Sequence, residues 1–197
     1  MRDKDGIYQQ QGFTDRIRTA LAQRKRQTLH DPDLVCAAVL IPLVFKEGEW
    51  HVVVTQRTEL VKHHRGQISF PGGACDPDDA DVLATALRET DEELGIPPDL
   101  VEILGSLDDL RTITEFVVTP VVGALRHPPV YRLNEAEVEE AIEVPLSFLL
   151  DPAQLRVEQW EHEGEMVTVL FWDYDSHTIW GATARILKSF LDVVAGA

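Results

Sequence analysis

Residues 86–95 read ALRETDEELG and place three glutamates, Glu89, Glu92 and Glu93, within about one helical turn. At about 100° per residue their carboxylates share one face of a predicted helix, and the leucines of the segment fall on the opposite face. Like charges at this spacing cost a helix a few tenths of a kcal/mol. Such a group of oxygen ligands is typical of sites for Mg²⁺ or Mn²⁺, and the alternative is an acidic face that is simply solvated.

The residues before this helix favour a phosphate site. Residues 70–73 read FPGG at the end of a predicted strand, and an aspartate-rich loop follows. Paired glycines permit the close backbone approach that phosphate-facing loops need. A calcium loop of the EF-hand type is excluded, because the twelfth residue counted from Asp76 is Leu87, where that motif requires glutamate.

Composition limits the classes of partner. The 197 residues include 34 acidic and 18 basic side chains, which gives a formal net charge of -16. This charge argues against broad electrostatic capture of nucleic acid or of an anionic membrane. No run approaches the roughly 18 apolar residues of a membrane span, and the polar start lacks the apolar core of a signal peptide. We therefore expect a cytoplasmic protein whose two cysteines, Cys36 and Cys75, are thiols.

The order of the predicted elements indicates one domain of mixed α and β structure. Residues 1–30 form an N-terminal helix and lead-in, and residues 31–197 form the domain. Two β-rich runs around a glycine turn predict a hairpin, and strands alternate with helices after it. The predicted helices cover residues 13–26, 79–94, 134–150 and 178–194, and the predicted strands cover residues 34–45, 50–57, 101–107 and 114–125 and a second hairpin over 155–174.

The segment from Arg88 to Ile96 resembles the second half of the Nudix box, R-E-U-x-E-E-x-G-U, where U is apolar. Gly73 and Asp79 fit the first half, with aspartate in place of glutamate and eight residues instead of seven before Arg88. Asp76 or Asp78 could serve in place of Asp79. The resemblance implies the Nudix α/β/α sandwich, an α/β fold with a central mixed sheet. It also implies a Mg²⁺ or Mn²⁺ cofactor, and a catalytic and metal-binding set of Arg88, Glu89, Glu92 and Glu93 with the backbone of Gly73.

The segment before the box, VVTQRTELVKHHRGQISFPGG at residues 53–73, resembles the motif that precedes the Nudix box in coenzyme A pyrophosphatases. The resemblance implies hydrolysis of coenzyme A or its thioesters to 3',5'-ADP and 4'-phosphopantetheine or its acyl form. Lys62 stands where that motif has its second arginine, so it keeps the charge without the planar fork. The implied substrate-binding residues are Arg57, Lys62, Arg65, Gly66, Phe70, Gly72 and Gly73.

Several roles stay open at the level of sequence. The general base is a box glutamate such as Glu89, or one of two later acids, Glu137 and Glu143. The alternative substrates are ADP-ribose, a nucleoside triphosphate or a dinucleotide, and a non-catalytic Nudix module that binds a nucleotide is a third hypothesis. The expected partner is a small nucleotide, with neither nucleic acid nor membrane, and the resemblance implies a homodimer. Tryptophans at 160, 172 and 180 either stack on adenine or belong to the core.

Overall fold

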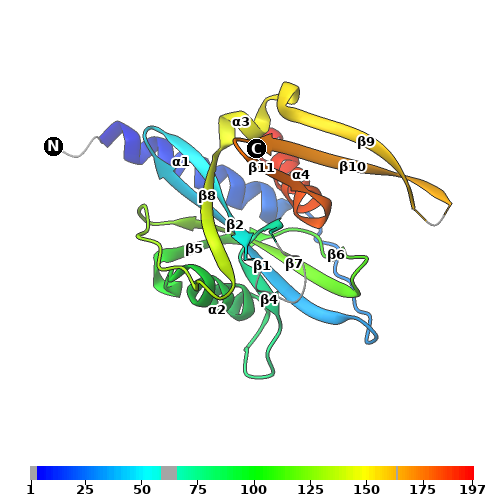
Figure 1. Cartoon of the computed structure of the whole chain (residues 1–197). Helices are drawn as coiled ribbons and strands as arrows, with labels where there is room; N and C mark the ends of the chain where they lie inside the picture. Colours follow the sequence, from blue (N-terminus) through cyan, green and yellow to red (C-terminus); the bar gives the residue numbers. More distant parts are fainter. Residues whose placement is uncertain (1–3, 59–65, 163) are drawn as a thin grey trace.

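The computed structural model describes residues 4–58, 66–162 and 164–197, with the backbone alone described for residues 4–10. The described helices are α1 (Lys4–Gln23), α2 (Val82–Leu94), α3 (Leu146–Leu150) and α4 (Gly181–Ala195), with short 3-10 helices at Pro98–Leu100 and Pro152–Gln154 (Figure 1). The described strands are β1 (Val35–Lys46), β2 (Glu49–Arg57), β3 (Ile68–Ser69), β4 (Gly72–Ala74), β5 (Val101–Ser106), β6 (Leu110–Arg111), β7 (Phe116–Leu125), β8 (Val138–Pro145), β9 (Leu155–His162), β10 (Glu165–Tyr174) and β11 (His177–Trp180).

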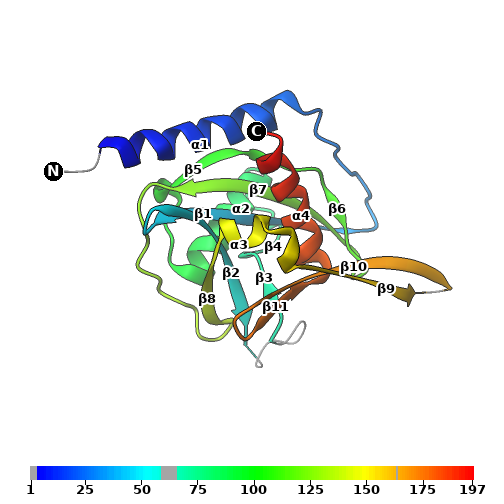
Figure 2. The same ribbon diagram turned by 90° about the horizontal axis from the view of Figure 1, so that it is seen from above.

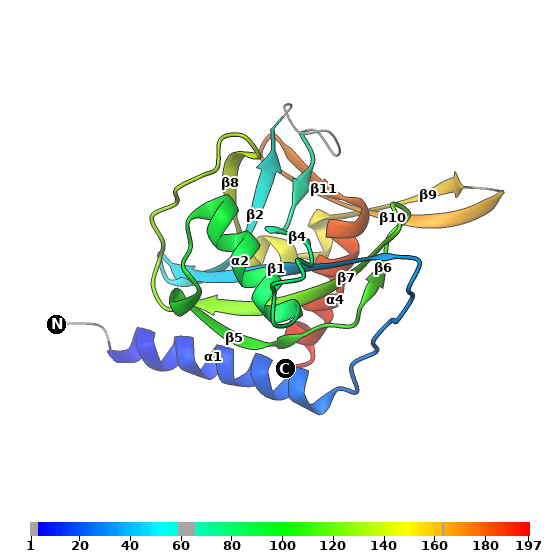
Figure 3. The same ribbon diagram turned by 90° about the horizontal axis from the view of Figure 1, so that it is seen from below.

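The main sheet is mixed, as predicted. Its strands run in the order β3-β2-β1-β7-β5, while β4 pairs with β1, β6 with β7 and β8 with β2. Strands β1 and β7 are parallel, and the other neighbours are antiparallel. A second sheet is formed by β11, β10 and β9, and its β9–β10 hairpin projects from the body as a long arm (Figures 1 and 3).

Helices cover both faces of the main sheet. Core residues of α1 and α4, such as Ile17 and Leu187, pack with Ile41 and Val52 on one face. The other face is covered by α2, whose Leu94 belongs to a separate core cluster with β1 and β2. Figure 2 looks onto the face that carries α4, and Figure 3 onto the face that carries α2. This arrangement confirms the predicted α/β/α sandwich.

In the described chain, no helix is long and apolar enough to cross a membrane.

The prediction of an acidic helix over residues 134–150 is wrong. Residues 138–145 form β8, and only residues 146–150 form the helix α3. The reason is that burial alternates along this segment with a period of two residues, because Ile142 and Val144 are buried while Glu143 between them is less buried. Strand β8 pairs with β2, with Val52 opposite Val144, so tertiary pairing overrides the helix propensity of the glutamates.

The helix of the three glutamates begins later than predicted. Its N-cap is Asp81, whose carboxylate accepts hydrogen bonds from the amides of Leu83 and Ala84, so α2 starts at Val82. It ends at Gly95, the predicted stop signal.

The prediction that both cysteines are thiols is also wrong. Cys36 and Cys75 form a disulfide, with their Cα atoms 5.4 Å apart. Their neighbours Ala37 and Ala74 face each other in the antiparallel pair of β1 and β4, and that pairing brings the two sulfurs together. Because 39 positions separate the cysteines in the chain, spacing alone did not reveal the pair.

Candidate active site

The three glutamates of α2 differ sharply in their exposure to solvent. Glu93 is buried, with 2% of its side chain exposed, and Glu89 is largely buried beside it. Glu92 is exposed, with 56% of its side chain accessible. Helix α2 packs on β1 and β4, so the two buried carboxylates face the strand that carries the glycine pair. The predicted carboxylate face is therefore directed against the sheet and is not a simple solvated surface.

Glu93 is a buried carboxylate with few partners. The backbone amide of Gly72 donates a hydrogen bond to its Oε2 at 3.3 Å, and Arg57 Nη1 lies 3.5 Å from its Oε1. Burial raises its pKa to about 8, against the lowering effect of Arg57 and the Gly72 amide, and the charges of Glu89 and Glu137 raise it further. The charged form of Glu93 is thus destabilised, and a bound cation would offset that cost.

The glycine pair is needed for the close approach of β4 to its neighbours. Gly72 has φ of +154°, and a Cβ there would lie 2.3 Å from the carbonyl oxygen of Ala38. A Cβ at Gly73 would lie 2.5 Å from the carboxyl carbon of Glu89. A side chain at Gly73 would therefore displace Glu89, and a side chain at Gly72 would collide with β1.

Arg88 connects the glutamates to the loop before the helix. Its Nε and Nη2 each donate to the Asp79 carboxylate at 3.0 Å, and Arg88 holds the pKa of Asp79 well below its usual range. Its Nη1 donates to Glu89 at 2.7 Å and to Glu92 at 3.2 Å. Asp79, and neither Asp76 nor Asp78, is the acid that pairs with Arg88, because the extra residue is absorbed in the turn before the Asp81 cap.

The donor set suits a hard divalent cation. Burial also raises the pKa of Glu89, so two neighbouring carboxylates are disfavoured in their charged form. Among the described residues no three acidic, histidine or cysteine side chains are gathered closely enough to enclose an ion. The Arg88 guanidinium contacts both Glu89 and Glu92. Carboxylate and backbone oxygens with room for water match the preference of Mg²⁺ and Mn²⁺. Glu89, Glu93 and the exposed Glu92 would hold it.

The predicted substrate residues divide into three groups. Arg57 and the two glycines lie at the glutamates, as described above. Phe70 is buried in the core, and Gly66 lies in a turn where its amide donates to the Arg57 carbonyl at 3.0 Å. Lys62 and Arg65 lie outside the described residues.

The two acids that the sequence offered as general bases occupy different places. The negative charge of Glu137 contributes to raising the pKa of both Glu89 and Glu93. Glu143 lies farther along β8, where Tyr131 Oη donates to it at 2.7 Å and Lys46 forms an ion pair with it. These contacts lower the pKa of Glu143 although burial alone would raise it. Of these two acids, Glu137 is the one whose charge acts on both Glu89 and Glu93.

The tryptophans also separate. Trp172 is buried in the core, whereas Trp160 and Trp180 are partly exposed on the second sheet, with their ring centroids 6.0 Å apart. The prediction that these tryptophans belong to the core is therefore confirmed for Trp172 alone.

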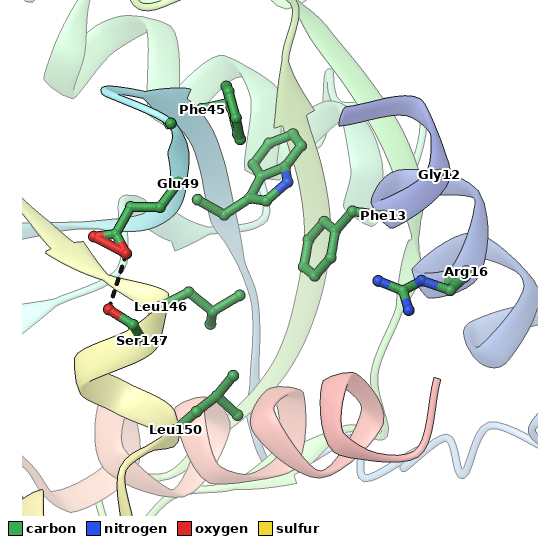
Figure 4. A pocket seen from close by; sticks show the side chains of 10 residues that line it. Gly12, Phe13, Arg16, Phe45, Glu49, Leu146, Ser147 and Leu150 are labelled. Atoms are coloured by element: carbon green, nitrogen blue, oxygen red, sulfur yellow. Dashed lines mark hydrogen bonds between the residues drawn. The ribbon is translucent and has the colours of Figure 1, made fainter. Parts of the chain in front are cut away.

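A cavity of about 640 Å³ lies away from the glutamates, between α1, the turn of β1 and β2, and α3 (Figure 4). The ring of Phe13 stacks on that of Trp50 at 5.1 Å, and Ser147 donates a hydrogen bond to Glu49 at 2.9 Å. The residues that line the cavity are Gly12, Phe13, Arg16, Phe45, Gly48, Glu49, Trp50, Leu146, Ser147 and Leu150. None of these residues belongs to the glutamate site, and the lining includes no cluster of catalytic groups.

Comparison with known proteins gives concordant matches. A family model described as "NUDIX domain" matches residues 35–170. A Photorhabdus laumondii protein named uncharacterized Nudix hydrolase NudL is 41% identical over 160 residues, which cover 80% of this chain and 84% of that protein. An Escherichia coli protein of the same name is 38% identical over 176 residues, which cover 89% of this chain and 90% of the relative. The crystal structure of a MutT/nudix family protein from Enterococcus faecalis covers 99% of this chain and 76% of its own, with a TM-score of 0.52 and 17% identity, and it supports the fold alone.

Proposed function

This chain belongs to the Nudix hydrolases, and from that premise we propose that it splits the pyrophosphate bond of coenzyme A or its thioesters. The products would be 3',5'-ADP and 4'-phosphopantetheine or its acyl form. One observation carries the proposal: the segment that resembles the coenzyme A motif ends in β4, which packs against the glutamate helix α2. Two residues of this segment, Arg57 and Gly72, contact the carboxylate of Glu93. Gly72 lies twenty-one positions before Glu93 in the chain.

The charge of the protein makes local cations necessary. An anionic substrate is repelled by a net charge of -16, so positive groups must face its phosphates. Arg57 lies beside Glu93, and its Nη1 is 3.5 Å from Glu93 Oε1. Because this contact is long, the guanidinium can instead donate hydrogen bonds to a phosphate oxygen. Lys62 and Arg65 follow in the same segment and would add charge for a second phosphate.

Nudix hydrolases generally use divalent ions such as Mg²⁺, and the ion, when bound, would polarise the pyrophosphate and lower the pKa of a water. Glu89, Glu92 and Glu93 would hold it, with the Gly73 carbonyl as a further oxygen. Arg88 would orient Glu89 through their hydrogen bond at 2.7 Å. Asp79 would in turn keep Arg88 in place.

The chain must also accept a proton from the attacking water. The water oxygen forms a bond to one phosphorus while the bridging P–O bond breaks, and the proton passes to a carboxylate. We assign Glu137 this role, because its charge acts on both buried glutamates, whereas Glu143 is held by Tyr131 and Lys46. Glu89 is the alternative acceptor.

Another nucleotide substrate is the second candidate, and Lys62 favours it. A lysine cannot provide the bidentate contact of the arginine in the motif, so ADP-ribose, a nucleoside triphosphate or a dinucleotide could be preferred. Thr58, which stands where the motif has serine or alanine, does not favour it, because its hydroxyl donates to the Ala136 carbonyl at 3.1 Å and has a structural role.

The test is product analysis by chromatography and mass spectrometry. Purified protein with Mg²⁺ is given coenzyme A, acetyl-coenzyme A, ADP-ribose and a nucleoside triphosphate in separate reactions. Release of 3',5'-ADP faster than any other product supports the proposal, and faster cleavage of another nucleotide overturns the substrate. Glu92→Gln is the matched control, since it removes an exposed carboxylate without disturbing the core, and it should abolish turnover while the fold stays intact. Binding of a nucleotide without cleavage by the parent would favour the non-catalytic module.

The homodimer implied by family likeness is a separate proposal. The projecting arm carries exposed apolar side chains, including Val157 and Met166, which a second copy could cover. Sedimentation velocity would show a dimer near 44 kDa, twice the chain mass of 22.1 kDa, or a monomer that contradicts it.

A further inference from the structure

The disulfide joins the two strands that position the glutamate site. Cys36 lies at the start of β1, and Cys75 directly follows β4, the three-residue strand that carries Gly72 and Gly73. The amide of Cys75 also donates to the Cys36 carbonyl at 2.9 Å. The covalent link is therefore placed two residues from the backbone that touches Glu89.

The ladder that holds β4 to the sheet is short, with one further backbone bond before it, from the Leu40 amide to the Pro71 carbonyl at 2.9 Å. Strand β4 pairs only with β1 among the described strands, over Ala37 with Ala74, Ala38 with Gly73 and Val39 with Gly72. Such a short strand has few ladder hydrogen bonds, so a covalent link at its end restricts its motion strongly.

A chain of contacts runs from the disulfide to the ligands. The carbonyl of Ala74, next to Cys75, accepts a hydrogen bond from Arg88 Nη2 at 3.2 Å. The same guanidinium donates to Glu89 at 2.7 Å. Gly73 is packed so closely against the Glu89 carboxylate that a single methyl group would not fit between them. A shift of β4 therefore moves both Glu89 and the arginine that orients it.

Solvent can reach the disulfide. Cys36 is exposed and Cys75 is partly exposed, so a reductant has access to the sulfurs. The chain has two cysteines in total, and both are in this bond. Any effect of a thiol reductant on the protein must then act through this pair.

We propose that the Cys36–Cys75 bond is a redox modification site that sets the affinity of the glutamate site for its divalent cation. A dithiol supplies two electrons and two protons: the S–S bond breaks, two S–H groups form, and the dithiol closes to a cyclic disulfide. In the oxidised protein β4 is fixed and Glu89 is pre-positioned. In the reduced protein β4 is held by its few hydrogen bonds, and the site loses order. The inference rests on the metal-binding assignment of the α2 glutamates and is independent of whether coenzyme A is the substrate.

The experiment compares the full chain in its two redox states. Thiol titration with a chromogenic disulfide reagent, together with peptide mass, should give no free thiol after mild oxidation and two after treatment with dithiothreitol. Mn²⁺ binding is then measured by electron paramagnetic resonance, without any substrate. We expect Mn²⁺ affinity about tenfold lower in the reduced protein, the low end of the effect of losing a group that orients metal ligands. Hydrogen exchange at residues 73–75 should become faster on reduction.

The double variant Cys36→Ser and Cys75→Ser is the control. It should bind Mn²⁺ as the reduced parent does, and dithiothreitol should not change it further. Equal Mn²⁺ affinity and equal exchange at residues 73–75 in both redox states of the parent would overturn the proposal, even if the melting temperature differed. Two free thiols after oxidation would overturn it as well. Absence of Mn²⁺ binding in both states would instead refute the metal assignment on which the proposal rests, whereas failure to cleave coenzyme A would leave the redox result unaffected.

Discussion

Glu143 and Glu93 are two acidic side chains whose surroundings shift their pKa values in opposite directions. Glu143 accepts a hydrogen bond from Tyr131 and forms an ion pair with Lys46, and these partners lower its pKa. Glu93 has one backbone amide at 3.3 Å and one distant guanidinium at 3.5 Å, and burial raises its pKa to about 8. The first is a satisfied structural carboxylate, and the second is a carboxylate whose charge the protein leaves poorly compensated.

This difference in partners and pKa between Glu143 and Glu93 distinguishes a functional acid from a structural one. A buried charge without close partners destabilises the fold, so its presence needs a cause other than stability. At Glu93 the cause that we propose is a divalent cation with its bound phosphate, which would supply the missing compensation. At Glu143 the protein supplies it alone, so this acid, although the sequence offered it as a base, contributes to the fold.

The largest expected effect is on turnover. Glu93→Gln removes a metal-binding oxygen and should reduce kcat by about 10³-fold or more, comparable to the loss of an essential electrostatic group in other enzymes. Glu143→Gln in the same assay should stay within a few-fold of the parent. Steady-state rates of both variants on the best substrate check the contrast, and similar losses for the two would remove it.

The next effect is stabilisation by the cation. Mg²⁺ that binds the folded state adds about 2.7 kcal/mol to the free energy of unfolding at 100 times its Kd. The melting temperature of the parent and of Glu143→Gln should therefore rise with Mg²⁺, and that of Glu93→Gln should rise much less. Calorimetry over a Mg²⁺ series makes the measurement, and an equal rise in all three proteins would place the cation elsewhere.

The smallest effect is the structural one. Glu143→Gln keeps the shape but weakens the contacts to Tyr131 and Lys46, and part of the ion pair is screened because the Lys46 side chain is about one-third exposed. The free energy of unfolding should fall by roughly 1–2 kcal/mol. Urea unfolding measures it, and a variant as stable as the parent would mean that the Glu143 contacts contribute nothing.

Much of this molecule could be predicted from its sequence. The glutamate helix, its glycine stop and the first hairpin follow from local periodicity and turn residues, and Arg57 and Gly72 came with the motif that precedes the helix. The strand at residues 138–145 could not be predicted, because its glutamates favour a helix and only pairing with β2 decides otherwise. The disulfide and the separation of Glu137 from Glu143 depend on strand register, which brings distant residues together. The pairing of Asp79 with Arg88 across an irregular spacing became decidable only once the helix start at Asp81 was known.

The account depends most on the poorly compensated charge of Glu93, and the pH dependence of stability tests it directly. The pKa of Glu93 is raised from 4.5 to about 8 in the folded protein, so the folded state binds its proton more tightly than the unfolded state. Its contribution to stability is complete below pH 4.5 and is lost as the pH rises to about 8, at roughly 1.4 kcal/mol for each pKa unit.

The measurement is the free energy of unfolding of the metal-free parent and of Glu93→Gln from pH 4.5 to pH 8. We predict that the parent loses stability relative to the variant across this range, until the variant is the more stable protein at pH 8. Parallel curves for the two proteins would show that Glu93 is compensated within the fold, and would contradict the account.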